Sequence, residues 1–125
     1  EFDSQVDLMK DKTIEMTDSM PGNQVTHSGN FKPRSHDVEG KAFIIESNNK
    51  KFLRFQDFDT INGPDLRIYL SSDLGNEDII DLGEIKATKG NINYELPDDV
   101  NLDKYNKVLV CCKPFRVLFS YAELV

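Results

Sequence analysis

The sequence predicts an all-β domain, either a β-sandwich or a jelly-roll-like barrel of about 7–9 short antiparallel strands, preceded by an N-terminal helix. From residue 38 onward apolar residues alternate with polar ones, which is typical of strands with one buried face. Gly, Pro, Asn and Asp recur between these segments, and no helical periodicity follows residue 20. At 125 residues the chain is long enough for one domain with its own core. We expect residues 1–30 to form a helical stalk and linker, and residues 31–125 to form the β domain.

Residues 3–20 are expected to form the N-terminal helix. Ser4 and Asp7 have the spacing of a helix capping box, and Val and Met residues recur after them at helical spacing. Because a Met-rich seam with a polar interruption packs weakly, a frayed stalk and a genuine contact with the domain or a neighbour both remain open. A Pro-Gly pair then ends the helix, and residues 21–37 are polar and rich in helix- and strand-breaking residues, which indicates a linker.

The first strands of the domain are expected at residues 41–46 and 51–55. Their apolar and polar residues alternate, and Asn48 and Asn49 between them favour a tight turn, because Asn tolerates positive φ. Residues 66–70 alternate in the same way after an Asn-Gly-Pro-Asp turn signal. These segments therefore predict half-buried strands.

The second half of the domain contains the most apolar segment. Shorter strands are expected at residues 79–82 and 92–96, each next to a glycine. Residues 108–112 (VLVCC) are apolar on both faces, which is typical of a strand in the middle of a sheet. Because Pro114 cannot donate to a strand ladder, a bend is expected before a last strand at residues 115–119. The apolar residues expected on one face of that strand are Phe115, Val117 and Phe119.

The net charge of −7 restricts the partners of the chain. No basic stripe is present, so nucleic-acid binding is not expected, and the negative charge also disfavours direct docking on anionic lipids. No run of about 18 apolar residues occurs, so no membrane span is expected. The chain does not begin with Met, which leaves room for a membrane or lipid anchor upstream of residue 1.

The motifs of the common enzyme classes are absent from the sequence. It has no nucleophile elbow, phosphate-binding loop, zinc-protease motif or dinucleotide fingerprint. A hydrolytic triad would have to use His27, in the expected linker, or His36. The sequence therefore leaves open whether the protein is an enzyme, and it favours a protein without catalytic activity.

Three aspartates, Asp57, Asp59 and Asp65, lie close together in the sequence. A calcium-binding loop starting at Asp57 requires Gly at its sixth place and Glu at its twelfth, where Asn62 and Ile68 stand. Side-chain bonds that stabilise turns explain these aspartates equally well. No metal site is predicted.

The chain has two cysteines, Cys111 and Cys112, next to each other near the end of the most apolar strand. Successive residues of a strand point to opposite faces, so the two thiols cannot line one pocket while the strand stays regular. Two inert core thiols are one interpretation. The other is a reactive Cys112 beside Lys113, whose ammonium group would lower the thiol pKa, although Lys113 alternates to the other face. The sequence by itself does not decide between inert core thiols and a reactive Cys112.

Several ordered blocks of the sequence resemble the electron-transfer DM-thirteen (DM13) family, a module also found in Skeletor-type proteins. They cover roughly residues 31–124. His36 and Gly40 match an H-x-x-x-G element near the start of the family domain. Where this chain has Cys111-Cys112-Lys113, the family usually has Trp-Cys-Lys, so Cys112 corresponds to the family cysteine. The three longer blocks are residues 53–70 (LRFQDFDTINGPDLRIYL), residues 81–97 (DLGEIKATKGNINYELP) and residues 108–124 (VLVCCKPFRVLFSYAEL).

The resemblance implies a β-sandwich module of extracellular or cell-surface proteins that serves electron transfer. In this interpretation Cys112 is the redox group or a ligand to haem or a metal ion, His36 is a second cofactor ligand, and a protein redox partner is expected. The alternative is a non-catalytic binding or assembly module with both cysteines in the core and loops such as residues 72–78 displayed. His36 then caps the turn into the first strand through a ring nitrogen.

Overall fold

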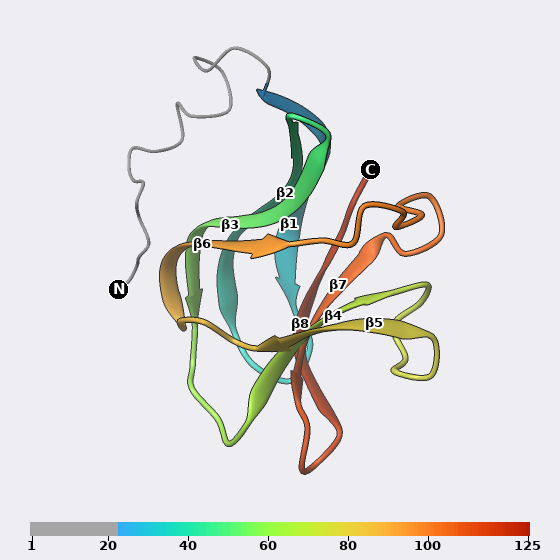
Figure 1. The fold of residues 1–125 in the computed structure, drawn as a ribbon. Helices are drawn as coiled ribbons and strands as arrows, with labels where there is room; N and C mark the ends of the chain where they lie inside the picture. The colour runs from blue at the N-terminus through green and yellow to red at the C-terminus, as the bar shows by residue number, and fades with distance from the viewer. Residues whose placement is uncertain (1–22) are drawn as a thin grey trace.

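The computed structural model describes residues 23–125, which form an all-β domain (Figure 1). The helix predicted at residues 3–20 lies outside the described residues. Within residues 23–125 no helix is long and apolar enough to cross a bilayer. The strands are β1 (Asn23–Pro33), β2 (Val38–Ser47), β3 (Lys50–Thr60), β4 (Leu66–Ser71), β5 (Ile79–Glu84), β6 (Lys89–Glu95), β7 (Lys107–Cys112) and β8 (Val117–Glu123).

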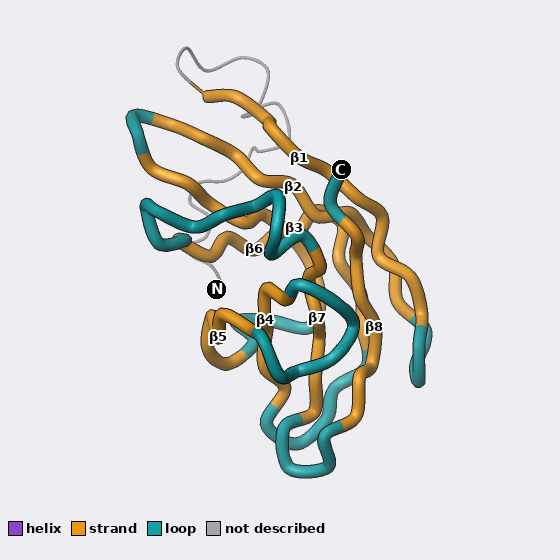
Figure 2. The backbone as a smooth tube through the Cα atoms, turned by 90° about the vertical axis from the view of Figure 1, so that its right-hand side faces the viewer, coloured by secondary structure: helices purple, strands orange, loops and turns teal. Residues whose placement is uncertain are grey.

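The strands form one eight-stranded sheet in the order β5-β4-β7-β8-β1-β2-β3-β6. Every neighbouring pair is antiparallel, as the sequence predicts. The two edge strands, β5 and β6, follow each other in the chain and are joined by residues 85–88 alone. Because this connection is short, the edges must approach each other, and the sheet curls into a half-barrel (Figures 1 and 2). The observed architecture is therefore a single curled sheet.

The hydrophobic core fills the inside of the curl. Phe31 from β1 and Phe55 and Phe58 from β3 meet there, with ring centroids 4.8–4.9 Å apart. At most 7% of each of these residues is exposed. Such pairs stabilise a core through buried area and through their tilted and edge-on geometry. The core therefore ties β1 to β3, which lies on the other side of β2 in the sheet.

The prediction of a linker at residues 21–37 is wrong for residues 23–33, because these residues form β1. This strand pairs with β2 from Asn23 to Asn30 and with β8 from Phe31 to Pro33. Its residues are mostly polar, so alternation gives little signal. The strand is stabilised by backbone pairing on both sides and by Phe31 in the core. Gly29 permits this pairing, because the backbone carbonyl of Glu123 lies where a Cβ would be. The sheet therefore begins at Asn23, before the domain start expected at residue 31.

The hairpin and bend predictions have different outcomes. Asn48 and Asn49 form the β2–β3 turn with φ of 54° and 67°, which confirms the turn predicted from their tolerance of positive φ. The last strand starts at Val117, later than predicted, and Phe115 is 68% exposed in the preceding turn. Arg116 has a φ of 53°, which turns the chain back after Pro114 and keeps Phe115 out of the strand.

Candidate functional site

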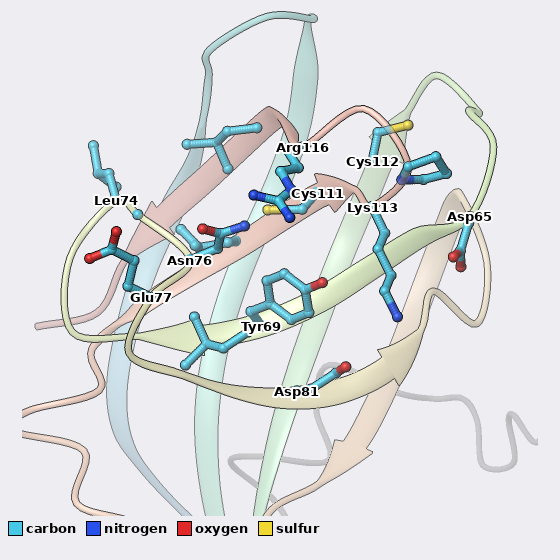
Figure 3. Close-up of a pocket in the computed structure, with 15 residues that line it drawn as sticks. Asp65, Tyr69, Leu74, Asn76, Glu77, Asp81, Cys111, Cys112, Lys113 and Arg116 are labelled. Atoms are coloured by element: carbon cyan, nitrogen blue, oxygen red, sulfur yellow. The ribbon is translucent and has the colours of Figure 1, made fainter.

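The end of β7 places the two cysteines on opposite faces of the sheet, as the two-residue strand period predicts. Cys112 is paired with Leu66 of β4 and Val117 of β8, and belongs to the interior core. Cys111 belongs to a smaller cluster on the outer face, with Tyr69 and Leu109. Cys112 is 2% exposed and Cys111 is 7% exposed. The two sulfurs point in different directions (Figure 3).

The thiol of Cys112 is held by the loop between β3 and β4. Its Sγ donates a hydrogen bond to the backbone carbonyl of Pro64, with 3.1 Å between the two atoms. The β7–β8 turn, residues 113–116, follows directly and is exposed throughout. Two backbone bonds hold this turn, from Lys113 N to the Asp65 carbonyl and from Arg116 N to the Lys113 carbonyl, each 3.2 Å long. Cys112 is therefore buried next to a segment with few bonds to the rest of the domain.

His36 lies in the β1–β2 loop, which projects from the same end of the half-barrel as the β3–β4 and β7–β8 loops (Figure 1). Its ring packs against the ring of Phe119, with centroids 4.2 Å apart. Its backbone N–H donates to the carbonyl of Phe119 at 3.2 Å. The turn is therefore closed by backbone bonds, and no interaction among residues 23–125 joins His36 to Cys112. His36 acts here as a packing residue.

The three aspartates of the β3–β4 region have separate partners. The carboxylate of Asp65 lies 3.7 Å from Arg67, and that of Asp59 lies 4.0 Å from Lys89. Asp57 has a φ of 54°, and its backbone N–H donates to the Asn91 side chain at 2.9 Å. Over the described part of the chain, no group of three or more His, Cys, Asp or Glu is arranged to hold a metal ion. Two of the three carboxylates are therefore in ion pairs, and the contact of Asp57 is made by its backbone.

An open cavity of about 900 Å³ lies over the outer face of β4, β5 and β7. Cys111 and Tyr69 lie at its apolar floor, and Lys113 and Arg116 from the β7–β8 turn lie at its rim (Figure 3). On the opposite side Asp81 of β5 pairs with Arg67 at 3.2 Å. Sequence reasoning missed this cavity, because it depends on which strands are neighbours. Tyr69 and Cys111 share a face only through the pairing of β4 with β7.

Burial raises the pKa of the Cys111 thiol to about 11, and the neighbouring Cys112 adds to the shift. The thiol is therefore protonated at neutral pH, and only the thiolate attacks an alkylating reagent. We expect the rate of iodoacetamide labelling at Cys111 to rise about tenfold per pH unit between pH 7 and pH 10 without levelling off near pH 9. Fragmentation mass spectrometry would separate labelling at Cys111 from labelling at Cys112. A plateau reached by pH 9 would contradict the raised pKa.

Residues 30–124 match the family model described as "Electron transfer DM13". The match covers the sheet from the end of β1 to β8, and it includes both Cys112 and His36. No curated protein and no solved structure matched the chain.

Proposed function

Because this match covers most of the chain, the chain belongs to the electron-transfer DM13 family, and we propose that it is a redox accessory module that uses the thiol of Cys112. The observation that carries the proposal is the position of this thiol at the end of β7. A single hydrogen bond to the Pro64 carbonyl holds the sulfur, directly beside the exposed turn of residues 113–116. Local opening of a loosely held segment costs less free energy than global unfolding, so a partner can reach the sulfur without unfolding the sheet.

The residues around Cys112 do not fit a haem or a metal ion. The thiol lies in the aliphatic and aromatic core and donates to a backbone carbonyl. Among the described residues no group of three or more His, Cys, Asp or Glu is arranged to hold a metal ion. His36, the other ligand that the family resemblance implies, is packed against Phe119. The proposal therefore uses the thiol itself, and no step passes through a metal or haem.

The proposed chemistry is thiol–disulfide exchange with a disulfide of a redox partner. Cys112 loses its proton to water, and the resulting thiolate attacks one sulfur of the partner's disulfide. A new S–S bond forms to Cys112 while the partner's S–S bond breaks, and the leaving thiolate takes up a proton. A second thiol of the partner class then attacks the mixed disulfide and releases Cys112 in its reduced form. Electrons pass between partners in pairs, and Cys112 is regenerated.

Reaction of the native protein with oxidised glutathione would test this proposal. We expect a mixed disulfide at Cys112 whose rate of formation saturates with glutathione concentration, because opening of the turn becomes limiting. Replacing Pro114, which stiffens the turn, by Gly is expected to raise that limiting rate several-fold. It should also lower the free energy of unfolding by about 1 kcal/mol, because Gly adds conformational entropy to the unfolded chain.

Two controls make the result decisive. Cys111→Ser removes the outer thiol and should leave the reaction intact, whereas Cys112→Ser should abolish it. If the mixed disulfide forms no faster than global unfolding, and Pro114→Gly does not change its rate, the thiol is a core residue and the redox proposal fails.

A second candidate function is a binding or assembly module. The burial of both cysteines, 7% and 2% exposed, favours it. So does the ordered loop of residues 72–78, in which Asp78 accepts hydrogen bonds from Tyr105 at 2.8 Å and Ser72 at 3.1 Å. If the folded protein does not react with oxidised glutathione, a binding or assembly module is better supported than a redox module.

An extracellular or cell-surface location and a protein redox partner are part of the same proposal. Both are supported by the family resemblance, and an oxidising compartment would supply the disulfides that the proposed exchange needs. Digestion of the protein by a protease added to intact cells of its source would test the location, and protection from digestion would count against it.

A further inference from the structure

The floor of the outer cavity is apolar and includes an aromatic ring. Tyr69, Leu109 and Cys111 are each at most 7% exposed, and Leu118 packs against them. A volume of about 900 Å³ lies within the usual range for small-molecule sites. The cavity can therefore hold a molecule whose apolar part lies on this floor.

The rim formed by the β7–β8 turn carries two cationic side chains that have no hydrogen-bond or ion-pair partner among the described residues. Lys113 and Arg116 are exposed and line the cavity, and neither side chain has a hydrogen-bond or ion-pair partner among residues 23–125. Arg67, in contrast, is paired with both Asp81 and Asp65. Arg116 has a φ of 53°, and its side chain lies on the cavity side of the turn in Figure 3.

The hydroxyl of Tyr69 is a third group without a partner. The residue is 5% exposed, its ring points into the cavity, and no hydrogen bond is made by its hydroxyl within the described part of the chain (Figure 3). Burial raises the pKa of Tyr69, and the nearby Asp81 and Cys111 raise it further. The hydroxyl therefore stays protonated at neutral pH and is free to donate a hydrogen bond.

The acidic groups around the cavity set the orientation of a ligand. Asp81 is occupied by Arg67 at 3.2 Å and by the backbone N–H of Gly83 at 2.8 Å, and Asp65 lies 3.7 Å from Arg67. Glu77 in the 72–78 loop lines the other end of the cavity and has no partner among the described residues. An anionic group is therefore disfavoured beside Glu77 and favoured beside Lys113 and Arg116.

We propose that this cavity binds a small organic anion, an aromatic carboxylate or sulfonate, whose ring lies on the apolar floor and whose anionic group lies between Lys113 and Arg116. The Tyr69 hydroxyl donates a hydrogen bond to the same ligand. Cys112 borders this cavity at the end of β7, but its thiol faces the interior core and donates to the Pro64 carbonyl. Binding therefore does not depend on the redox function proposed above.

Fluorescence titration with 1-anilinonaphthalene-8-sulfonate would test the site, with the neutral N-phenyl-1-naphthylamine as the matched probe. We expect saturable binding of the sulfonate at one site per chain and at least tenfold weaker binding of the neutral probe. Lys113→Gln together with Arg116→Gln should weaken sulfonate binding by about tenfold or more, because charge-assisted bonds are lost. Tyr69→Phe should weaken it a few-fold.

Control variants separate this site from nonspecific dye binding and from the redox thiol. Arg34→Gln removes an exposed arginine of the β1–β2 loop that does not line the cavity, and should leave binding unchanged. Cys112→Ser should also bind normally, and bound sulfonate should slow iodoacetamide labelling of Cys111 at pH 9. The proposal is overturned if both probes bind equally, if Arg34→Gln and the Lys113/Arg116 pair have the same effect, or if Cys111 is not protected. Far-UV circular dichroism would show that each variant is folded.

Discussion

Phe31→Ala is expected to lower the free energy of unfolding by about 3–5 kcal/mol, the usual loss for a phenylalanine removed from a core. Phe31 is 7% exposed, and its ring contacts those of Phe55 and Phe58 at 4.8 and 4.9 Å. Removal of the ring leaves a cavity between β1 and β3 that neither neighbour can fill without moving the sheet. Because the chain has no Trp, urea unfolding followed by far-UV circular dichroism is the suitable measurement.

Phe115→Ala is the matched control for this prediction. Its side chain is 68% exposed in the β7–β8 turn, so its removal should change the stability by less than about 0.5 kcal/mol. If residues 21–37 formed a linker, the two variants would behave alike. Equal free energies of unfolding for Phe31→Ala and Phe115→Ala would therefore show that Phe31 of β1 is not part of the core.

Gly40→Ala is expected to destabilise the domain by about 3–5 kcal/mol, for two separate reasons. Gly40 has a φ of 117°, a conformation that costs a residue with a Cβ about 1–3 kcal/mol. A Cβ at this position would also lie 2.8 Å from Cα of Phe58 and 3.0 Å from the carbonyl oxygen of Asp57. Overpacking against a backbone that cannot move adds a cost of similar size. Urea unfolding again provides the measurement.

Gly90→Ala separates the two contributions. Gly90 has a similar φ of 109°, but nothing lies within 4 Å of an added Cβ. Its substitution should therefore show the backbone cost alone, about 1–3 kcal/mol. A loss for Gly40→Ala no larger than that for Gly90→Ala would mean that β2 and β3 are not in close contact at Phe58.

The two faces of β7 have different chemistry because of the strand period. Cys112 is enclosed by core residues and directly precedes the exposed turn of residues 113–116. Cys111 faces the outer cavity, and its raised pKa keeps it protonated. The same turn supplies Lys113 and Arg116 to the outer cavity, and we propose that it also limits access to the inner thiol. A ligand that orders this turn is expected to slow reactions of Cys112.

Local pattern in the sequence was sufficient for several parts of this protein. Alternation located the β2–β3 hairpin and β4, and the unbroken apolar run located β7 in the middle of the sheet. The two-residue period placed Cys111 and Cys112 on opposite faces without knowledge of any neighbour. The ordered family blocks identified the family, which the match over residues 30–124 confirms.

Three features became clear only in the tertiary structure: the presence of strand β1, the closure of the sheet and the outer cavity. A polar strand such as β1 is stabilised by its partners β2 and β8, so its own residues carry almost no periodic signal. Phe115 was misplaced for a related reason, since the positive φ of Arg116 turns the chain before the apolar alternation ends. Pairing register brings Tyr69 and Cys111 onto one face, and register is a property of two strands together. Sequence alone determines which residues a strand can present on each face, whereas the neighbours in the sheet determine what those residues meet.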